Sequence, residues 1–335
     1  MTAGGETGVS ARRDGPLKVA IGVATRGRPR MFAACLHALE RLEIPPGVTP
    51  LFIFVENDET LHISEAVEAF RARTGHVLRL AAEPRLRIPF ARNRVLDLAL
   101  AEEADALAFL DDDEEADPGW LAAHVAAFRA GGAALAGGPV EMIAPDGPLT
   151  RLERWMLAGW QDLEARIDRR NRERIARGER RALHIRCNNW FADLAFVRAH
   201  GLRFDERFPF SAGEDGAFRA AVVRAGGRLD WVPAARVRER ATRERLRPAH
   251  VLRRFADATA TRHRRLGKAR GAGAWLRLPF ALAADAALAL GHLARLPLAP
   301  GPALFRALFQ AGKALGRIRA LRGGAGGYYR RVTGG

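Results

Sequence analysis

The sequence predicts an α/β fold, in which a mixed, mostly parallel sheet is flanked by helices. Two observations support this prediction. Strand-like and helix-like segments alternate through the N-terminal half of the chain, as they do in parallel sheets covered by helices on both faces. Three of the strand-like segments also end in polar clusters, and such sheets bind ligands outside the carboxyl ends of their strands. We therefore expect one crevice along this edge of the sheet.

The order of the elements follows from runs and spacings of apolar residues. Short apolar runs predict strands at residues 18–24, 50–55, 77–81, 106–110 and 229–232. Apolar residues at helical spacing predict helices at residues 31–42, 61–73, 89–101, 118–130, 151–182 and 217–225. The sequence shows no internal repeat, and we expect residues 17–246 to form one domain.

The fourth expected strand ends in five consecutive acids, Asp111 to Glu115, in the segment FLDDDEE. These carboxylates repel one another, and two interpretations account for them. They lie in a solvated turn before the next helix, whose N-terminus favours negative charge, or they hold a cation. Hard divalent cations such as Mg²⁺ or Mn²⁺ prefer oxygen ligands, and Asp111–Asp113 are the better candidates. The motif alone leaves both interpretations open.

A second pair of acids, Glu214 and Asp215, comes directly before an apolar helical pattern. Acids at this position are common, because they stabilise the N-terminus of a helix. The aromatic and glycine-containing loop before them, RFPFSAG at residues 207–213, instead suggests a shaped pocket. This pair is therefore either ordinary helix-start charge or part of a site.

The excess of positive over negative charge lies in the last quarter of the chain. Residues 243–335 carry 19 Lys and Arg against 3 Asp and Glu, and this excess equals the whole chain's net charge of +16. The two cysteines, Cys35 and Cys187, lack the spacing of a metal site and imply no disulfide framework, which fits a reducing cytosol. Residues 1–16 are polar and glycine-rich, and we expect them to be disordered rather than an export signal.

Residues 247–335 are expected to form a basic, helical, membrane-associating tail. The apolar stretch at 276–296 is interrupted by Pro279, Asp285 and His292, which argues against a confident membrane span of about 20 residues. A second amphipathic stretch follows at 303–321. Basic residues beside apolar faces suit anionic headgroups, so the preferred interpretation is an interfacial helical hairpin. A helical packing domain and a dimer interface are the alternatives.

Taken in order, several segments resemble family 2 glycosyltransferases of the GT-A fold, and more narrowly the bacterial exopolysaccharide enzymes of the succinoglycan type. The matching segments are VAIGVATRGRPRMFAACLHAL, FIFVENDE, RIPFARNRVLDLAL, AFLDDDEEADPGWL, CNNWFADLAFV, FDERFPFSAGEDGAFRAAVVRAGG and the terminal GYYRR. The resemblance covers residues 17–246 well and the tail loosely. An aspartate-rich DxD motif is common alone, but its combination with the downstream Glu-Asp pair and IPFARNR is specific.

The resemblance implies a nucleotide-sugar donor, with a UDP-sugar expected, and a divalent cation, Mn²⁺ or Mg²⁺. The implied donor-binding residues are Thr25, Arg26, Glu56, Asp58, Arg92, Asn93, Asp111 and Asp112. Glu56 stands where the family usually has an Asp that contacts base or ribose. Asp113 and Asp111 would hold the metal, which neutralises charge as the nucleoside diphosphate leaves.

The resemblance also implies roles on the acceptor side. Asp215 would be the general base, and Glu214, Asn189 and Trp190 would contact the acceptor; by residue type alone, Asn189 is equally a turn residue and Trp190 a core residue. Many relatives carry a His after the last core strand that assists at the metal. This chain has VRERATRERL at residues 237–246 instead, which leaves Glu239 or Arg243 for that role.

The expected function is an inverting glycosyltransferase at the cytoplasmic face of the cell membrane, which extends a polyprenyl-linked or polysaccharide acceptor in exopolysaccharide or cell-surface glycan assembly. A nucleic-acid-binding protein is the rival class because the tail is basic, but no helix-turn-helix, zinc or RNP pattern occurs, and we expect no nucleic-acid partner. A nucleotidylyltransferase would need a Gly-rich, Lys-containing loop after the first strand. A Rossmann dehydrogenase would need GxGxxG after a strand.

Overall fold

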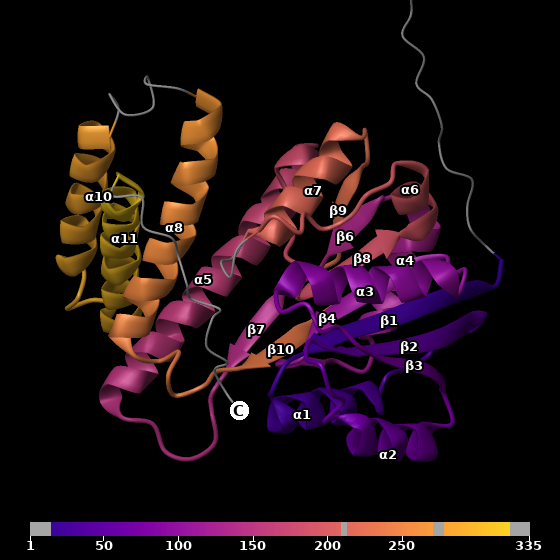
Figure 1. Ribbon diagram of the computed structural model, residues 1–335. Helices are drawn as coiled ribbons and strands as arrows, with labels where there is room; N and C mark the ends of the chain where they lie inside the picture. The colour runs from indigo at the N-terminus through magenta and orange to yellow at the C-terminus, as the bar shows by residue number, and fades with distance from the viewer. Residues whose placement is uncertain (1–14, 209–212, 271–277, 322–335) are drawn as a thin grey trace, which may run out of the picture.

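The computed structural model describes residues 15–208, 213–270 and 278–321. The disorder expected at the N-terminus, part of the RFPFSAG loop and the terminal GYYRR segment therefore lie outside the described residues. A seven-stranded sheet forms the centre of the molecule, with helices on both faces and a helical bundle to one side (Figure 1). The predicted α/β fold with a mostly parallel sheet is confirmed.

The strand order of the main sheet is β3-β2-β1-β4-β8-β6-β9. Its strands are β1 (Leu17–Thr25), β2 (Val48–Glu56), β3 (Val77–Ala82), β4 (Ala106–Asp111), β6 (Leu135–Gly137), β8 (Asn189–Asp193) and β9 (Leu229–Trp231). The first four are parallel, whereas β8 runs antiparallel to both β4 and β6. A smaller sheet has the order β5-β10-β7, with β5 (Glu114–Ala116), β7 (Val140–Ile143) and β10 (Val237–Arg240).

Alternation along the strands divides the apolar side chains between two layers. Phe52 and Phe54 of β2 point to the face covered by α1 (Pro29–Leu39), α2 (Ser64–Thr74) and α4 (Trp120–Gly131). Ile53 and Val55 point to the opposite face, covered by α3 (Ile88–Ala101), α6 (Leu194–Ala199) and α7 (Glu214–Arg224). α3 lies so close to the sheet that a side chain at Gly22 would collide with Val95.

The helix ends follow from local chemistry. Thr150 begins α5 (Arg151–Ala176) with a capping box, in which its hydroxyl accepts from the Glu153 N–H and the Glu153 carboxylate accepts from the Thr150 N–H. The helix expected to continue to residue 182 stops at Ala176 instead. Gly178 then takes a positive φ of 71°, which glycine adopts without strain, and a single 3-10 turn follows at Arg180–Ala182.

Three further helices form the bundle: α8 (Pro248–Arg270), α10 (Leu278–Leu293) and α11 (Pro300–Leu321). α11 packs against α5 and α8, and α10 packs against α11. Close approach is possible because Gly312 and Gly316 of α11 meet the backbone of α8, where a side chain would not fit. A third apolar core, which includes Met142, Trp160 and Phe305, joins the bundle to α5 and the small sheet. None of the helices in the described part of the chain is long and apolar enough to cross a bilayer.

Candidate active site

A pocket opens where the carboxyl ends of β1 and β4 meet the N-terminus of α7. Parallel pairing brings the strand ends to one level, because Thr25 of β1 stands opposite Glu56 of β2 and Ala24 opposite Asp111 of β4. The arginines in its described lining are Arg26, Arg28, Arg87, Arg92, Arg186, Arg245 and Arg254. The acids in that lining are Asp111, Asp112, Asp113, Glu114, Glu214, Asp215 and Glu239. Acids and arginines are thus equal in number.

The three consecutive aspartates are each paired with an arginine rather than left to repel one another. Asp111 accepts from Arg92 at 2.8 Å, and Asp112 accepts from Arg28 at 2.9 Å. Asp113 accepts from Arg245 at 2.8 Å and from Arg28 at 3.4 Å. Figure 1 places the strand end that carries these acids near the centre of the molecule, where arginines from α3, the start of α1 and the loop before α8 converge.

Burial gives these acids different protonation behaviour. It raises the pKa of Asp112 to about 6 against the opposing charge of Arg28. Burial would also raise the pKa of Asp113, but Arg245 and Arg28 outweigh it and hold that pKa below its ordinary value. The pKa of Glu114 lies well above its ordinary value because of burial and the neighbouring Asp113. Asp113 is therefore ionised at neutral pH, whereas burial and the neighbouring charge shift the pKa of Glu114 toward the protonated form.

The donor set of the pocket fits a hard divalent cation that shares its ligands with a substrate. Among the described residues, no group of three or more His, Cys, Asp or Glu side chains is arranged around one point. Mg²⁺ commonly takes only one or two protein carboxylates and completes its shell with water and substrate phosphates. Asp111, whose side chain is 35 % exposed, and the ionised Asp113 supply oxygens of this kind. These two residues could hold such an ion.

Arg92 connects the two ends of the pocket. Its guanidinium donates to Asp111 at 2.8 Å and to Glu214 at 2.6 Å, which ties the end of β4 to the start of α7. Arg92 is buried, and its two carboxylate partners offset the cost of burying its charge. Burial raises the pKa of Glu214 to about 7, against the opposing charge of Arg92. One carboxylate oxygen of Glu214 is buried without a hydrogen-bond partner among the described residues.

Asp215 stands beside Glu214 on the first turn of α7 and faces the pocket. It is partly exposed, and its carboxylate accepts from the Gly216 N–H at 2.6 Å. The residue that caps this helix, Gly213, has a φ of 124°, which other residues rarely adopt. This geometry directs a carboxylate into the pocket on the side away from the aspartate run.

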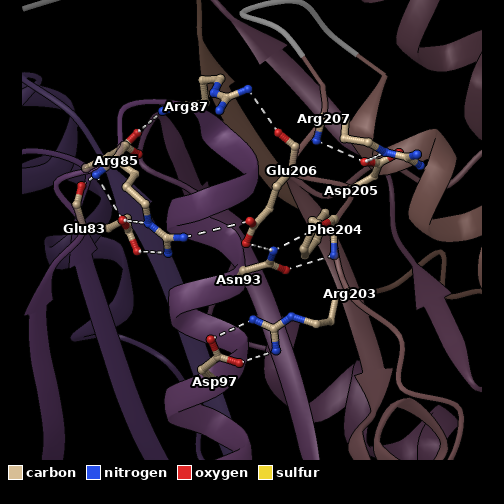
Figure 2. A network of polar contacts seen from close by, with 11 residues as sticks. Glu83, Arg85, Arg87, Asn93, Asp97, Arg203, Phe204, Asp205, Glu206 and Arg207 are labelled. Carbon is tan, nitrogen blue, oxygen red and sulfur yellow. Dashed lines mark hydrogen bonds and ion pairs between the residues drawn. The ribbon is translucent and has the colours of Figure 1, made fainter.

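Asn93, predicted to bind the donor, has a different place. Its side chain holds the loop before α7, where it donates to the Phe204 carbonyl and to Glu206, both at 3.0 Å, and accepts from the Phe204 N–H at 2.9 Å (Figure 2). Arg87 donates to the Glu206 carbonyl at 3.1 Å in the same network. Asn93 is buried against this loop and does not line the pocket, and its role as a donor contact stays a prediction.

Glu56 and Asp58, also predicted donor contacts, do not line the pocket either. Glu56 is buried and accepts from the backbone N–H groups of His62 and Ile63, at 2.6 and 3.1 Å, while Asp58 accepts from its neighbour Glu59. Asn57 lines the pocket in their place, with its side chain bonded to the loop that leads into α3. Within the polar segment Glu56–Asp58, the side chain that lines the pocket is the middle one, Asn57.

Asn189 and Trp190 lie in the core, and their expected acceptor role stays a prediction. Asn189 is 1 % exposed, accepts from the Trp120 indole at 2.9 Å and donates to the Ala235 carbonyl at 2.8 Å. Trp190 packs among Phe109, Phe204 and Phe218. The neighbour that faces the pocket is Asn188, which donates to Glu114 at 2.6 Å.

The structure brings eight of the predicted site residues together around the pocket. They are Thr25, Arg26, Arg92, Asp111, Asp112, Asp113, Glu214 and Asp215. Of the two candidates for the missing His, Glu239 lines it and Arg243 does not, because Arg243 pairs with Glu153 outside the pocket. Glu239 stands opposite Glu114 in the small sheet and forms an ion pair with Arg245. Sequence reasoning missed Arg28 and Arg245, whose only signal was proximity to the expected motifs in an arginine-rich chain.

Comparison with known proteins agrees with this geometry. The glycosyl transferase family 2 model matches residues 20–192, which is more than half of the chain. This chain is a member of glycosyl transferase family 2. It is 33% identical, over 224 residues that make up 67% of each chain, to the succinoglycan biosynthesis protein ExoM of Rhizobium meliloti (strain 1021). The predicted family and the predicted enzyme class, a glycosyltransferase, are confirmed.

Among solved structures, the family 2 chain is similar to the mannosyltransferase PcManGT from Pyrobaculum calidifontis, determined in complex with GDP-Man and Mn²⁺. The TM-score is 0.60 at 17% sequence identity, and the match covers 93% of this chain and 89% of that one. At this identity the similarity concerns the fold, and it confirms the predicted GT-A arrangement.

Replacing Asn93 by Ala should destabilise this glycosyltransferase by about 1–3 kcal/mol, because the buried Phe204 N–H and carbonyl would lose their partner. Urea unfolding measures the change. The matched control is Asp97→Ala, which removes the exposed Arg203–Asp97 pair of the same network (Figure 2) and should cost at most about 1 kcal/mol. Equal losses in the two variants would contradict the anchoring role of Asn93.

The pKa of Glu214, raised from an ordinary 4.5 to about 7, predicts a pH effect on stability. Because the folded protein holds this proton more tightly, the contribution is present below pH 4.5 and is lost as the pH rises through 7. Between pH 5 and 8, the unfolding free energy of the wild type should fall relative to that of Glu214→Gln by on the order of 2 kcal/mol. Parallel pH profiles in urea unfolding would contradict this.

Proposed function

We propose that this enzyme transfers a sugar from a nucleoside-diphosphate donor, a UDP-sugar, to a hydroxyl of a polyprenyl-linked or polysaccharide acceptor, with inversion at the anomeric carbon. The observation that supports this most is the position of Arg92, whose guanidinium joins Asp111 on the donor side to Glu214, the neighbour of Asp215, on the acceptor side. The Arg92 side chain thus lies between the donor side and the acceptor side of the pocket, where the sugar would be transferred.

The donor half of the pocket suits a nucleoside diphosphate. Thr25, Arg26 and Asn57 lie beside one another at the ends of β1 and β2 and would receive the nucleoside. Asp111 and Asp113 would hold a divalent cation, which neutralises charge on the departing diphosphate. Arg28 and Arg245 lie next to these carboxylates, so they would also bind phosphate oxygens through charge-assisted hydrogen bonds.

The acceptor half supplies a base. Asp215 would take the proton from the acceptor hydroxyl as that oxygen attacks the anomeric carbon. The bond to the acceptor oxygen forms on the face opposite the diphosphate while the bond to the diphosphate oxygen breaks. A single displacement of this kind inverts the centre. Glu214 would help to orient the acceptor through its unpartnered oxygen.

The relatives support the donor class and the biological process. PcManGT was determined with a nucleotide sugar and Mn²⁺, and ExoM is a succinoglycan biosynthesis protein. We therefore propose that this enzyme acts in the assembly of an exopolysaccharide or another cell-surface glycan. A polyprenyl-linked acceptor would lie in the membrane, so we further propose that the enzyme works at the cytoplasmic face of the cell membrane, with residues 247–335 against anionic lipid.

Asp215→Asn should abolish sugar transfer and leave donor binding within about twofold of the wild type, because the amide cannot accept the proton but keeps the shape of the side chain. Transfer to acceptor is measured by release of nucleoside diphosphate, and donor binding by calorimetry. Asp205→Asn, in the loop before α7 and outside the pocket lining, is the control. Unchanged turnover in Asp215→Asn would refute the base assignment.

Asp113→Asn should weaken Mn²⁺-dependent binding of a UDP-sugar at least tenfold, since one metal ligand loses its charge. Thermal shift in Mn²⁺ and in chelator measures this, with a GDP-sugar as the alternative donor. The control Glu115→Gln removes a neighbouring acid of the same run, which pairs with Arg240 outside the pocket, and should bind donor normally. Wild-type donor binding that persists in chelator would contradict the role of Asp113.

A further inference from the structure

Helix α10 buries its charged residue and exposes its apolar residues, which is the opposite of the usual pattern for a surface helix. Its sequence, LPFALAADAALALGHL, contains one charged residue, Asp285. That residue is 3 % exposed and faces α11, where it accepts from Lys313 at 2.9 Å and from Arg317 at 2.7 Å. In water a surface helix normally presents its charges outward and its leucines inward. α10 does the reverse.

The outward face of α10 is apolar throughout. Phe280 is 79 % exposed, Leu290 67 % and Leu288 50 %, and four of the alanines between Phe280 and Leu290 are exposed as well. Ten large apolar side chains are exposed among the described residues, and five of them lie within residues 278–298. The others are single residues spread over the surface, which is ordinary, whereas a continuous patch of this kind usually marks an interaction site.

The bundle directs this face away from the catalytic domain. Figure 1 shows α10 at the outer edge of the bundle, with α11 between it and α8. Arg317 also contacts His263 of α8, at 2.8 Å, so Asp285 is held by a network that spans all three helices. Separating these charges would leave a buried charge unpaired, which is costly. The network therefore fixes the rotation of α10, with Phe280 and Leu290 facing outward.

We propose that the outer face of α10 is a membrane-docking surface, which inserts its apolar side chains into the interface of an anionic lipid layer. The chemistry of the face favours lipid over protein, because apart from Phe280 residues 278–294 contain none of the aromatic residues, Arg or Met that are enriched at protein interfaces, and leucine and alanine predominate instead. Cationic residues border the stretch in the sequence, with Lys268, Arg270 and Arg277 before it and Arg295 after it. They complement anionic headgroups.

The length of α10 determines how it lies in the lipid. Its 16 residues extend about 24 Å, and the described helices include none that could cross a bilayer. Because Asp285 holds one side of α10 against α11, we expect the helix to lie in the plane of the interface with its opposite, apolar face inserted. Asp285 stays on the protein side, paired with α11, so no charge enters the hydrocarbon. This surface rests on the membrane partner proposed above and names the residues that contact it.

Glutamate substitutions on the outer face test the surface in the full-length protein. The variant Phe280→Glu/Leu290→Glu should bind vesicles of phosphatidylcholine and phosphatidylglycerol (3:1) at least tenfold more weakly than the wild type in a flotation assay. The matched control is Val77→Glu/Leu152→Glu, which places the same two charges on large apolar residues exposed elsewhere, 55 % and 43 %, and should bind as the wild type does. All three proteins should melt within a few degrees of one another.

Two results would overturn the proposal. One is equal vesicle binding by the wild type and the α10 variant. The other is a wild type that forms a dimer without lipid and an α10 variant that is monomeric by light scattering, since a second copy would then cover the face. Donor-dependent thermal shift, measured on the same proteins without vesicles, reports on the proposed glycosyl transfer separately. Vesicle binding without donor binding would refute that function and leave the docking surface standing.

Discussion

The pocket depends on the buried guanidinium of Arg92. It is the contact that joins the end of β4 to the start of α7, through Asp111 and Glu214. Burying an unpaired charge is costly, so the Arg92 guanidinium is stable in this position only while the carboxylates of Asp111 and Glu214 are in place to pair with it. The same helix, α3, carries Asn93, which holds the loop before α7. Two consecutive side chains of α3, Arg92 and Asn93, therefore hold Asp111 in position and hold the loop that leads to Asp215.

Balanced charge explains how so many acids can share one pocket. Its described lining contains as many arginines as acids, and burial and the neighbouring acids raise the pKa of Glu114. An anionic nucleoside diphosphate would meet the arginines of this lining. Arg28 and Arg245, which now neutralise Asp112 and Asp113, stand where they could turn to phosphate oxygens once a cation takes over the carboxylates.

The sequence predicted the sheet, because strand-length apolar runs and helical spacings reflect burial directly, and it located the polar clusters because these end the strands. It could not choose between neighbours within a cluster. Asn57 rather than Glu56, and Asn188 rather than Asn189, face the pocket, since adjacent residues of an extended chain point to opposite sides and no spacing rule says which side holds the ligand. The partners of the aspartates depend on tertiary folding, as Arg245 lies 132 residues from Asp113.

The bundle and the pocket cannot be separated at residue 247, where the basic tail was expected to begin. Arg254 of α8 lines the pocket and lies over the Trp160 ring of α5, 5.4 Å from its centroid. Phe305 of α11 packs on the same tryptophan. Removing the tail would therefore remove Arg254 from the pocket and expose Trp160, in addition to removing any membrane contact. Because α10 packs chiefly against α11, changes on its outer face can alter attachment while the pocket stays intact.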